Sequence, residues 1–170
     1  MIGGHSSSSV LTLRSILYYC LTLLIACGLQ SVVFGRLGWR GAHPDCPLTL
    51  ALTAALLTDS RIGCLTGMAS GFMTSGIVGE TMGTYLVSRT VAGYAAGVPT
   101  GRLYRGKLGV ALAGVFVCSI IAETILALSA PRLTLEHWLI SIPGSALFNM
   151  ALAFPMFYLL RSFGWGGDRH

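Results

Sequence analysis

The sequence has little charge. Only 10% of its 170 residues are Asp, Glu, Lys or Arg, six of them acidic, whereas 54% are apolar. About a quarter of the residues of a typical soluble domain are charged, so this chain cannot cover the surface of a water-soluble domain of its length. The mean hydropathy of +0.73 points the same way. The composition therefore excludes an ordinary soluble domain and predicts a protein surrounded by lipid.

The sequence also lacks the alternation of apolar and polar residues that marks the strands of a membrane β-barrel. Its apolar runs are continuous, and backbone groups in lipid must form their hydrogen bonds within helices or closed barrels. We therefore predict an all-α fold, a polytopic transmembrane helical bundle. The links are short, so sequence neighbours should be antiparallel neighbours in space. The predicted spans are residues 15–35, 46–58, 62–79, 81–98, 108–130 and 138–160.

One domain accounts for the chain. Residues 1–14 read as a flexible cytoplasmic tail, 15–163 as the six-helix domain and 164–170 as a short cytoplasmic tail. Segment 46–58 is short for a hydrocarbon core of roughly 30 Å, so five spans remain an alternative. Both arrangements place the C-terminus in the cytoplasm, and six spans place the N-terminus there as well. Both also place one basic loop inside, where it acts as a topogenic signal or meets anionic lipid: Arg102, Arg105 and Lys107.

The aromatic residues agree with these boundaries. Trp39 and Trp138 are predicted at the outer membrane surface, and Tyr104 and Trp165 at the inner one. Indole and phenol rings prefer the membrane–water interface because they are amphipathic. This pattern supports the topology without indicating a function.

Catalytic and metal-binding patterns are missing. The four histidines lie in predicted tails and loops without a second ligand at metal spacing. The five cysteines form no C-x-x-C pair, as expected of small packing residues in a reduced setting. The basic pI of about 9.2 follows from the topology, and no motif supports nucleic-acid binding. We expect no enzymatic activity, no catalytic residue, no metal, no cofactor and no nucleic-acid partner.

The third predicted span carries an unbroken ladder of small residues. Its members recur every four positions and form one stripe on a helix: Gly63, Gly67, Gly71, Ser75 and Gly79. Shorter ladders are Gly93, Gly97 and Gly101 on the fourth span, and Ala51 with Ala55 on the second. Such faces let another helix approach closely. The stripes either pack the bundle's own helices or receive the helix of a partner, with Gly63, Gly67, Gly71, Ser75, Gly79, Gly93 and Gly97 as the docking residues.

Three polar groups lie inside the predicted spans: Arg89, Glu123 and Asn149. A charge near the bilayer centre costs on the order of 3 kcal/mol on insertion scales. Arg89 and Glu123 fall at similar depths on consecutive antiparallel helices, so we expect them to form an ion pair. These groups either fix helix register or serve as a proton or substrate relay, or in partner recognition.

The chain resembles one known family. Its motifs are a Pro-Asp pair before an apolar run, glycines at fixed spacing in two spans, and a last span with proline and asparagine before a basic end. They cover roughly residues 15–163 and are similar to those of MreD, the rod shape-determining membrane proteins. One departure is Glu80, where that family often has an aspartate and a short loop. The residues that carry the resemblance are Pro44, Asp45, Leu56, Leu57, Gly63, Gly67, Gly71, Phe72, Gly83, Thr84, Arg89, Gly93, Tyr94, Gly97, Pro143 and Asn149.

The resemblance implies a bacterial inner-membrane protein with six spans, both termini in the cytoplasm and no known reaction. Members belong to the elongation machinery that organises lateral peptidoglycan synthesis and cell shape. The implied partners are the single-span protein MreC, the glycosyltransferase RodA, a class B penicillin-binding transpeptidase and the actin-like MreB, with membrane lipids around them. On this interpretation the chain is a membrane adaptor whose glycine stripe receives an MreC-like helix.

An alternative comes from another class of protein. Substrate-binding S components of energy-coupling-factor vitamin transporters have similar length and six helices. They need a pocket near the outer membrane surface with convergent polar groups. The outer half of the predicted bundle offers few such groups here. The small-residue coupling motif of their first helix is also not evident in residues 15–35. The candidate pocket residues are Glu80, Glu123, Glu136, His137 and Trp138.

Overall fold

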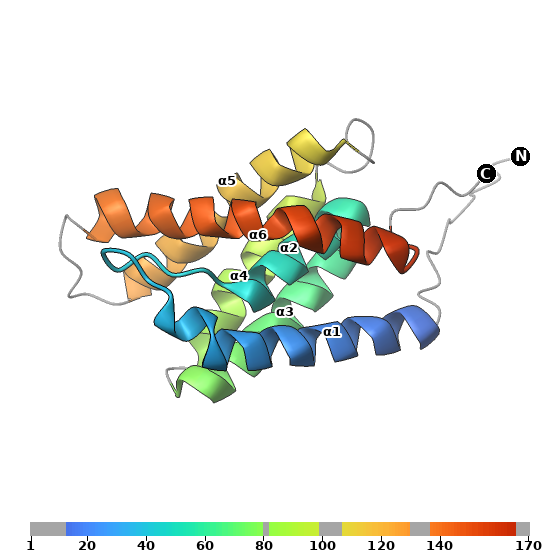
Figure 1. Cartoon of the computed structure of the whole chain (residues 1–170), viewed down its shortest axis with the longest axis horizontal. Helices are drawn as coiled ribbons and strands as arrows, with labels where there is room; N and C mark the ends of the chain where they lie inside the picture. The colour runs from blue at the N-terminus through green and yellow to red at the C-terminus, as the bar shows by residue number, and fades with distance from the viewer. Residues whose placement is uncertain (1–12, 80–81, 99–106, 130–136, 166–170) are drawn as a thin grey trace, which may run out of the picture.

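A computed structural model describes residues 13–79, 82–98, 107–129 and 137–165. The regular structure in these ranges is helical apart from one isolated bridge between Trp39 and Ala42. The all-α prediction is confirmed. The elements, drawn in Figure 1, are α1 (Leu13–Val32), η1 (Phe34–Arg36), α2 (Cys46–Leu57), α3 (Ser60–Val78), α4 (Met82–Gly97), α5 (Leu108–Ser129), η3 (His137–Ser141) and α6 (Ile142–Ser162).

Three stretches of helix are long and apolar enough to cross a membrane by length and composition: Ile16–Arg36, Leu108–Ser129 and Trp138–Ser162. Helix α2 is apolar but shorter. Large apolar side chains on the outside of the longer helices are exposed, as expected of surfaces that face lipid rather than water. On α1 they include Leu17, Leu21, Leu24 and Ile25. These features indicate a membrane protein.

Helix α2 is the centre of the fold. All twelve of its residues are buried, and it contacts α1, α3, α4, α5 and α6. Figure 1 shows it enclosed by the longer helices. A helix that is apolar on every face is typical of a core position, so the chain's shortest apolar segment fills the interior while longer helices form the outside.

The ends of α2 and α3 follow from their capping residues. The Asp45 carboxylate accepts a hydrogen bond from the Leu48 backbone N–H and caps α2, with Pro47 in the first turn. The Asp59 carboxylate accepts from the N–H groups of Arg61 and Ile62 and caps α3. Aspartate is among the preferred N-caps because its oxygens satisfy the free N–H groups of the first turn. The polar break between the second and third predicted spans is therefore a helix boundary.

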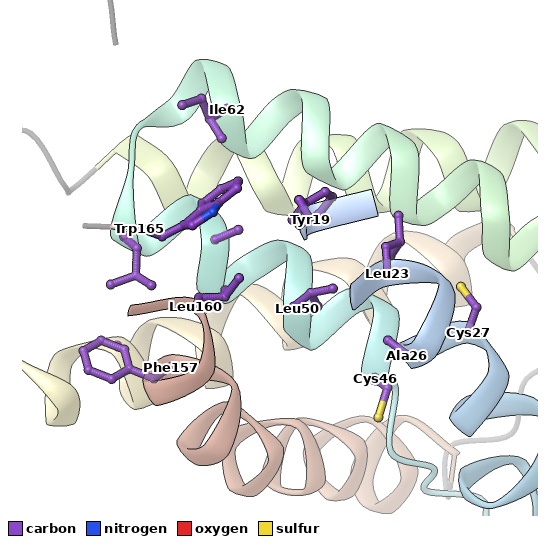
Figure 2. Close-up of a cluster of buried hydrophobic side chains, with 13 residues drawn as sticks. Tyr19, Leu23, Ala26, Cys27, Cys46, Leu50, Ile62, Phe157, Leu160 and Trp165 are labelled. Carbon is purple, nitrogen blue, oxygen red and sulfur yellow. The ribbon is translucent and has the colours of Figure 1, made fainter. Parts of the chain in front are cut away.

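Helix α6 ends in a glycine turn. Gly164 has a positive φ of 84°, and the Trp165 N–H donates to the Leu160 carbonyl oxygen at 3.2 Å, the long-range bond of a glycine-terminated helix. This turn returns the Trp165 indole to the core, where its ring centroid lies 5.5 Å from that of Tyr19 (Figure 2). Trp165 is therefore buried against the packed helices.

Candidate functional site

The main polar site joins α4 to the start of α2. Arg89 lies in the middle of α4 and only 2% of its side chain is exposed. Its Nη2 forms an ion pair with Asp45 Oδ2. Its Nη1 donates to Ser70 Oγ at 2.9 Å and to Thr74 Oγ1 at 2.7 Å, both on α3. A guanidinium buried among helices is thus compensated by one carboxylate and two hydroxyls, as a charge in an apolar interior requires.

Asp45 also connects α2 to α6 and α5. Its backbone N–H donates to Asn149 Oδ1 on α6 at 2.7 Å, and Asn149 Nδ2 donates to Ser119 Oγ on α5 at 3.2 Å. Asn149 is fully buried. These two hydrogen bonds give both the oxygen and the nitrogen of its amide a partner inside the bundle. Asp45 therefore caps α2, forms the ion pair with Arg89 and binds the Asn149 amide.

Helix α1 joins the same site through Gln30. Its Nε2 donates to the Pro44 carbonyl oxygen and its Oε1 accepts from the Cys46 N–H, each at 2.9 Å. These bonds pair backbone groups on both sides of Asp45. We call the group formed by Gln30, Asp45, Ser70, Thr74, Arg89, Ser119 and Asn149 the polar junction, and it links all six α-helices.

The predicted ion pair between Arg89 and Glu123 is wrong. Ser88 Oγ donates to the Ala122 carbonyl oxygen at 2.7 Å, so α4 and α5 do lie side by side at this level. The carboxylate that binds Arg89 nevertheless belongs to Asp45. Within the described residues, Glu123 has no hydrogen bond or ion pair and is partly buried on α5. The positions of Arg89 and Glu123 along their helices do not determine the direction in which the Arg89 side chain points.

The glycine stripe of α3 faces α4. A Cβ on Gly63 would overlap the carbonyl oxygen of Gly93, and one on Gly67 would overlap that of Arg89. A Cβ on Gly71 would lie 2.8 Å from the Tyr85 carbonyl oxygen. The stripe was a candidate for receiving a partner helix, but α4 already occupies it. The alternative of internal packing describes these glycines correctly, because only hydrogen at each Cα allows the two backbones to touch.

The other small residues have separate roles. Gly97 approaches the Ser60 backbone and so belongs to the same α3–α4 interface as Gly93. Ser75 is buried and donates to the Phe72 carbonyl oxygen within its own helix at 2.7 Å. Gly79 has a φ of 71° and terminates α3 in the left-handed conformation. The five-residue ladder therefore combines three glycines that pack against α4, a serine that hydrogen-bonds within its own helix and a glycine that caps the helix.

Several predicted residues lie outside the described residues: Arg102, Arg105, Gly101, Tyr104, Glu80 and Glu136. Lys107 is exposed immediately before α5. Trp138 is partly buried in η3, and His137 begins that element. The structure thus brings Arg89 and Asn149 together around Asp45, and leaves Glu123 apart from their hydrogen-bond network.

From the sequence, Asp45 was named only for its part in the family resemblance, and neither it nor Gln30, Ser70 or Thr74 was identified as a site residue. The signal for Asp45 was present, because an aspartate just before a proline and an apolar run is an N-cap pattern. Ser70 and Thr74 are four residues apart and share the α3 face that points to the core. The missing step was that α2 is too short to reach the surface at both ends, so its cap is inside the bundle.

The polar junction holds helices together, since both Nη atoms of Arg89 and the Asn149 amide bind other members of the junction, while Arg89 Nε is buried without a partner. Among the residues in the four described ranges, no three His, Cys, Asp or Glu side chains are arranged to hold a metal ion. Comparisons with protein-family models, curated proteins and solved structures found no match for this chain.

Proposed function

We propose that this protein is a non-enzymatic adaptor of the MreD kind in a bacterial inner membrane. It crosses the membrane six times with both termini in the cytoplasm. It docks the transmembrane helix of an MreC-like protein and helps to organise lateral peptidoglycan synthesis and cell shape. RodA, a class B penicillin-binding transpeptidase and MreB are the further partners that the family resemblance suggests.

The path of the chain around α2 supports six spans. Twelve helical residues cover about 18 Å at about 1.5 Å per residue, which is too short for a hydrocarbon core of roughly 30 Å. The extended segment before α2 is buried at Ala42 and Pro44 and adds about 3.3 Å per residue. Its backbone is hydrogen-bonded to Gln30, Ser145 and Asn149. Non-helical backbone is tolerated at membrane depth where protein surrounds it in this way.

The internal use of the charged groups supports an adaptor rather than a carrier. Arg89, Asp45 and Asn149 are held by one another and by neighbouring hydroxyls. A carrier needs convergent polar groups that remain free for a substrate. A buried network whose main donors bind neighbouring side chains, with only Arg89 Nε left unpaired among its described atoms, instead fixes helix register, which keeps the outer surface of a scaffold constant.

The observation that carries the proposal is a set of glycines with no internal role. Cβ atoms at Gly76 of α3 and Gly83 of α4 would meet nothing within 4 Å, unlike those at Gly63, Gly67 and Gly71. Both glycines are exposed. Exposed large apolar side chains of the same two helices include Leu65, Met68, Phe72, Val87, Val91 and Tyr94, and we call these residues with Gly76 and Gly83 the outer face. An open glycine within a stripe of exposed apolar side chains would let another helix approach closely, and Gly76 and Gly83 have this setting, whereas the open Gly109 lies in the first turn of α5 beside the exposed Lys107. We place the docking of the MreC-like helix on this outer face.

Co-purification from native membranes in mild detergent tests the proposal. Wild-type protein should recover an MreC-like protein with cell-wall synthases. Gly76→Leu and Gly83→Leu should lose that partner. The added side chains have room, so the unfolding midpoint of each variant should change no more than a surface substitution changes it. Gly109→Leu is the matched control, since Gly109 is an exposed glycine on α5 with the same open surroundings, and it should keep the partner.

Two results would contradict different parts of the proposal. If Gly76→Leu and Gly83→Leu both retain the partner, the docking face is elsewhere on the bundle. If the wild-type protein instead recovers a membrane coupling subunit with paired ATPases, the adaptor function is wrong and the S-component alternative replaces it.

A further inference from the structure

The connection between α1 and α2 contains a small, well-defined hairpin. Trp39 and Ala42 exchange both backbone hydrogen bonds, each at 3.0 Å. Arg40 and Gly41 between them have φ values of 50° and 85°. Two central residues with positive φ define the tight turn that suits a two-residue hairpin. Positive φ is uncommon for a residue with a side chain, so an arginine is held at the tip in an unusual conformation.

The hairpin is fastened to the bundle on one side. The Ser141 Oγ donates to the Gly41 carbonyl oxygen at 2.7 Å, and the His43 N–H donates to Ser145 Oγ at 3.0 Å. Ala42 is buried. Figure 1 shows this connection beside the first turns of α6, at the end of the molecule where α1 finishes. The orientation of the tip is therefore set by α6.

The opposite side of the hairpin is apolar and basic, and it is exposed. Trp39 is 65% exposed and Leu37 is 52% exposed. Arg36 and Arg40 are exposed beside them, and the Arg40 guanidinium carbon lies 5.4 Å from the Trp39 ring centroid. We call Arg36, Leu37, Trp39 and Arg40 the hairpin surface.

The two arginines of the hairpin surface have no acidic partner in the described part of the chain. The three acidic residues described there are engaged or distant. Asp45 binds Arg89, Asp59 caps α3 at the far end of α2, and Glu123 lies on α5. Two guanidinium groups with no acidic partner among the described residues, next to an exposed indole, therefore form a site of positive charge at the end of an apolar helix.

We propose that the hairpin surface binds the phosphate headgroups of anionic phospholipid. A guanidinium presents paired N–H donors that match phosphate oxygens, and an indole rests at headgroup depth with its apolar body toward the acyl chains. The surface lies where α1 leaves the membrane, so it meets headgroups in either the six-span or the five-span arrangement. The inference depends on a membrane location and not on the adaptor function.

Fluorescence quenching in reconstituted vesicles tests this inference. Two vesicle preparations contain the same mixture of phosphatidylglycerol and phosphatidylcholine, with bromine near the headgroup on one lipid or on the other. The signal of Trp39 is the difference between wild-type protein and Trp39→Phe, which removes the contributions of Trp138 and Trp165. Per mole of brominated lipid, phosphatidylglycerol should quench Trp39 several-fold more than phosphatidylcholine.

The controls separate a specific site from general attraction of charge. Arg36→Gln with Arg40→Gln should abolish the preference for phosphatidylglycerol. Arg61→Gln should keep it, because Arg61 is an exposed arginine at the opposite end of α2. Equal quenching by both lipids would overturn the proposal, as would no quenching of Trp39 or a preference that persists in the double variant.

Discussion

Two buried regions hold this bundle together by opposite means. Along the α3–α4 interface, Gly63, Gly67 and Gly93 bring backbone against backbone, and stability depends on the absence of side chains. At the polar junction, Arg89 and Asp45 meet through charge, and stability depends on side chains that satisfy each other. The first region fails when atoms are added and the second when atoms are removed. A membrane bundle can thus gain specificity without relying on the hydrophobic effect, which is weak between helices in lipid.

The two regions share one helix. Arg89 supplies the backbone carbonyl against which Gly67 packs and also the guanidinium of the polar junction. Close packing of α3 and α4 brings Ser70 and Thr74 within hydrogen-bond distance of that guanidinium. The glycine interface therefore positions the charge network, and the effect of breaking each region should differ in size and in how it can be rescued.

Gly67→Leu should have the largest effect, because its Cβ would overlap the Arg89 backbone and no rotamer avoids this contact. We expect a loss of more than about 4 kcal/mol of unfolding free energy, in the range reserved for severe core disruption. Unfolding by sodium dodecyl sulfate in mixed micelles measures it. Gly76→Leu on the same helix is the control and should unfold like wild type. Similar unfolding of both variants would show that α3 and α4 are not in backbone contact.

Arg89→Met should lower the unfolding free energy by about 3 kcal/mol, since removal of one partner leaves the other charge uncompensated inside the bundle. Asp45→Asn keeps an oxygen that can cap α2 but removes the charge, so the double variant should lose less than the sum of the two single losses. The same unfolding assay on all four proteins gives the coupling energy. Additive losses would mean that the ion pair contributes nothing to stability.

Asn149→Leu should cost about 2 kcal/mol, because the Asp45 N–H and the Ser119 hydroxyl would lose a partner in a buried site. Amide hydrogen exchange adds a local measurement. Protection should fall first in the opening turn of α2 rather than in α3 or α4. Uniform loss of protection would indicate that Asn149 supports general packing instead of the polar junction.

Glu123→Gln should have the smallest effect, within about 0.5 kcal/mol, because it removes no hydrogen bond or ion pair that the described residues make and changes the side-chain volume little. Glu123 has no bond to Arg89, so neutralising it should leave the coupling between Arg89 and Asp45 unchanged. Repeating the double-variant cycle in the Glu123→Gln background measures this. A markedly larger coupling energy would show that Glu123 competes with Asp45 for the guanidinium.

The sequence predicted the helices well because charges, glycines and apolar runs mark their ends directly. It also identified Gly63, Gly67 and Gly71 as a close-packing face, since that pattern depends only on helical spacing. It did not predict what fills the face, because two helices of one chain and two helices of different proteins use the same small residues.

The sequence failed at the polar junction for a different reason. Arg89 and Asp45 are far apart in sequence, and their meeting depends on how deep α2 begins inside the bundle. That depth follows from the extended backbone around Pro44, which is held by Gln30 and Asn149. Depth estimated from helix midpoints pairs Arg89 with the acidic residue at the same depth on the next helix, which is Glu123.

The burial of α2 has a consequence for the biosynthesis of the protein. The helices that cover α2 include α4, α5 and α6, all of which leave the ribosome after it. Until α4 is made, Asp45 has no guanidinium to bind, and until α6 is made its backbone N–H has no amide. The contacts that seat Asp45 at the start of α2 are therefore complete only after α6 has been synthesised.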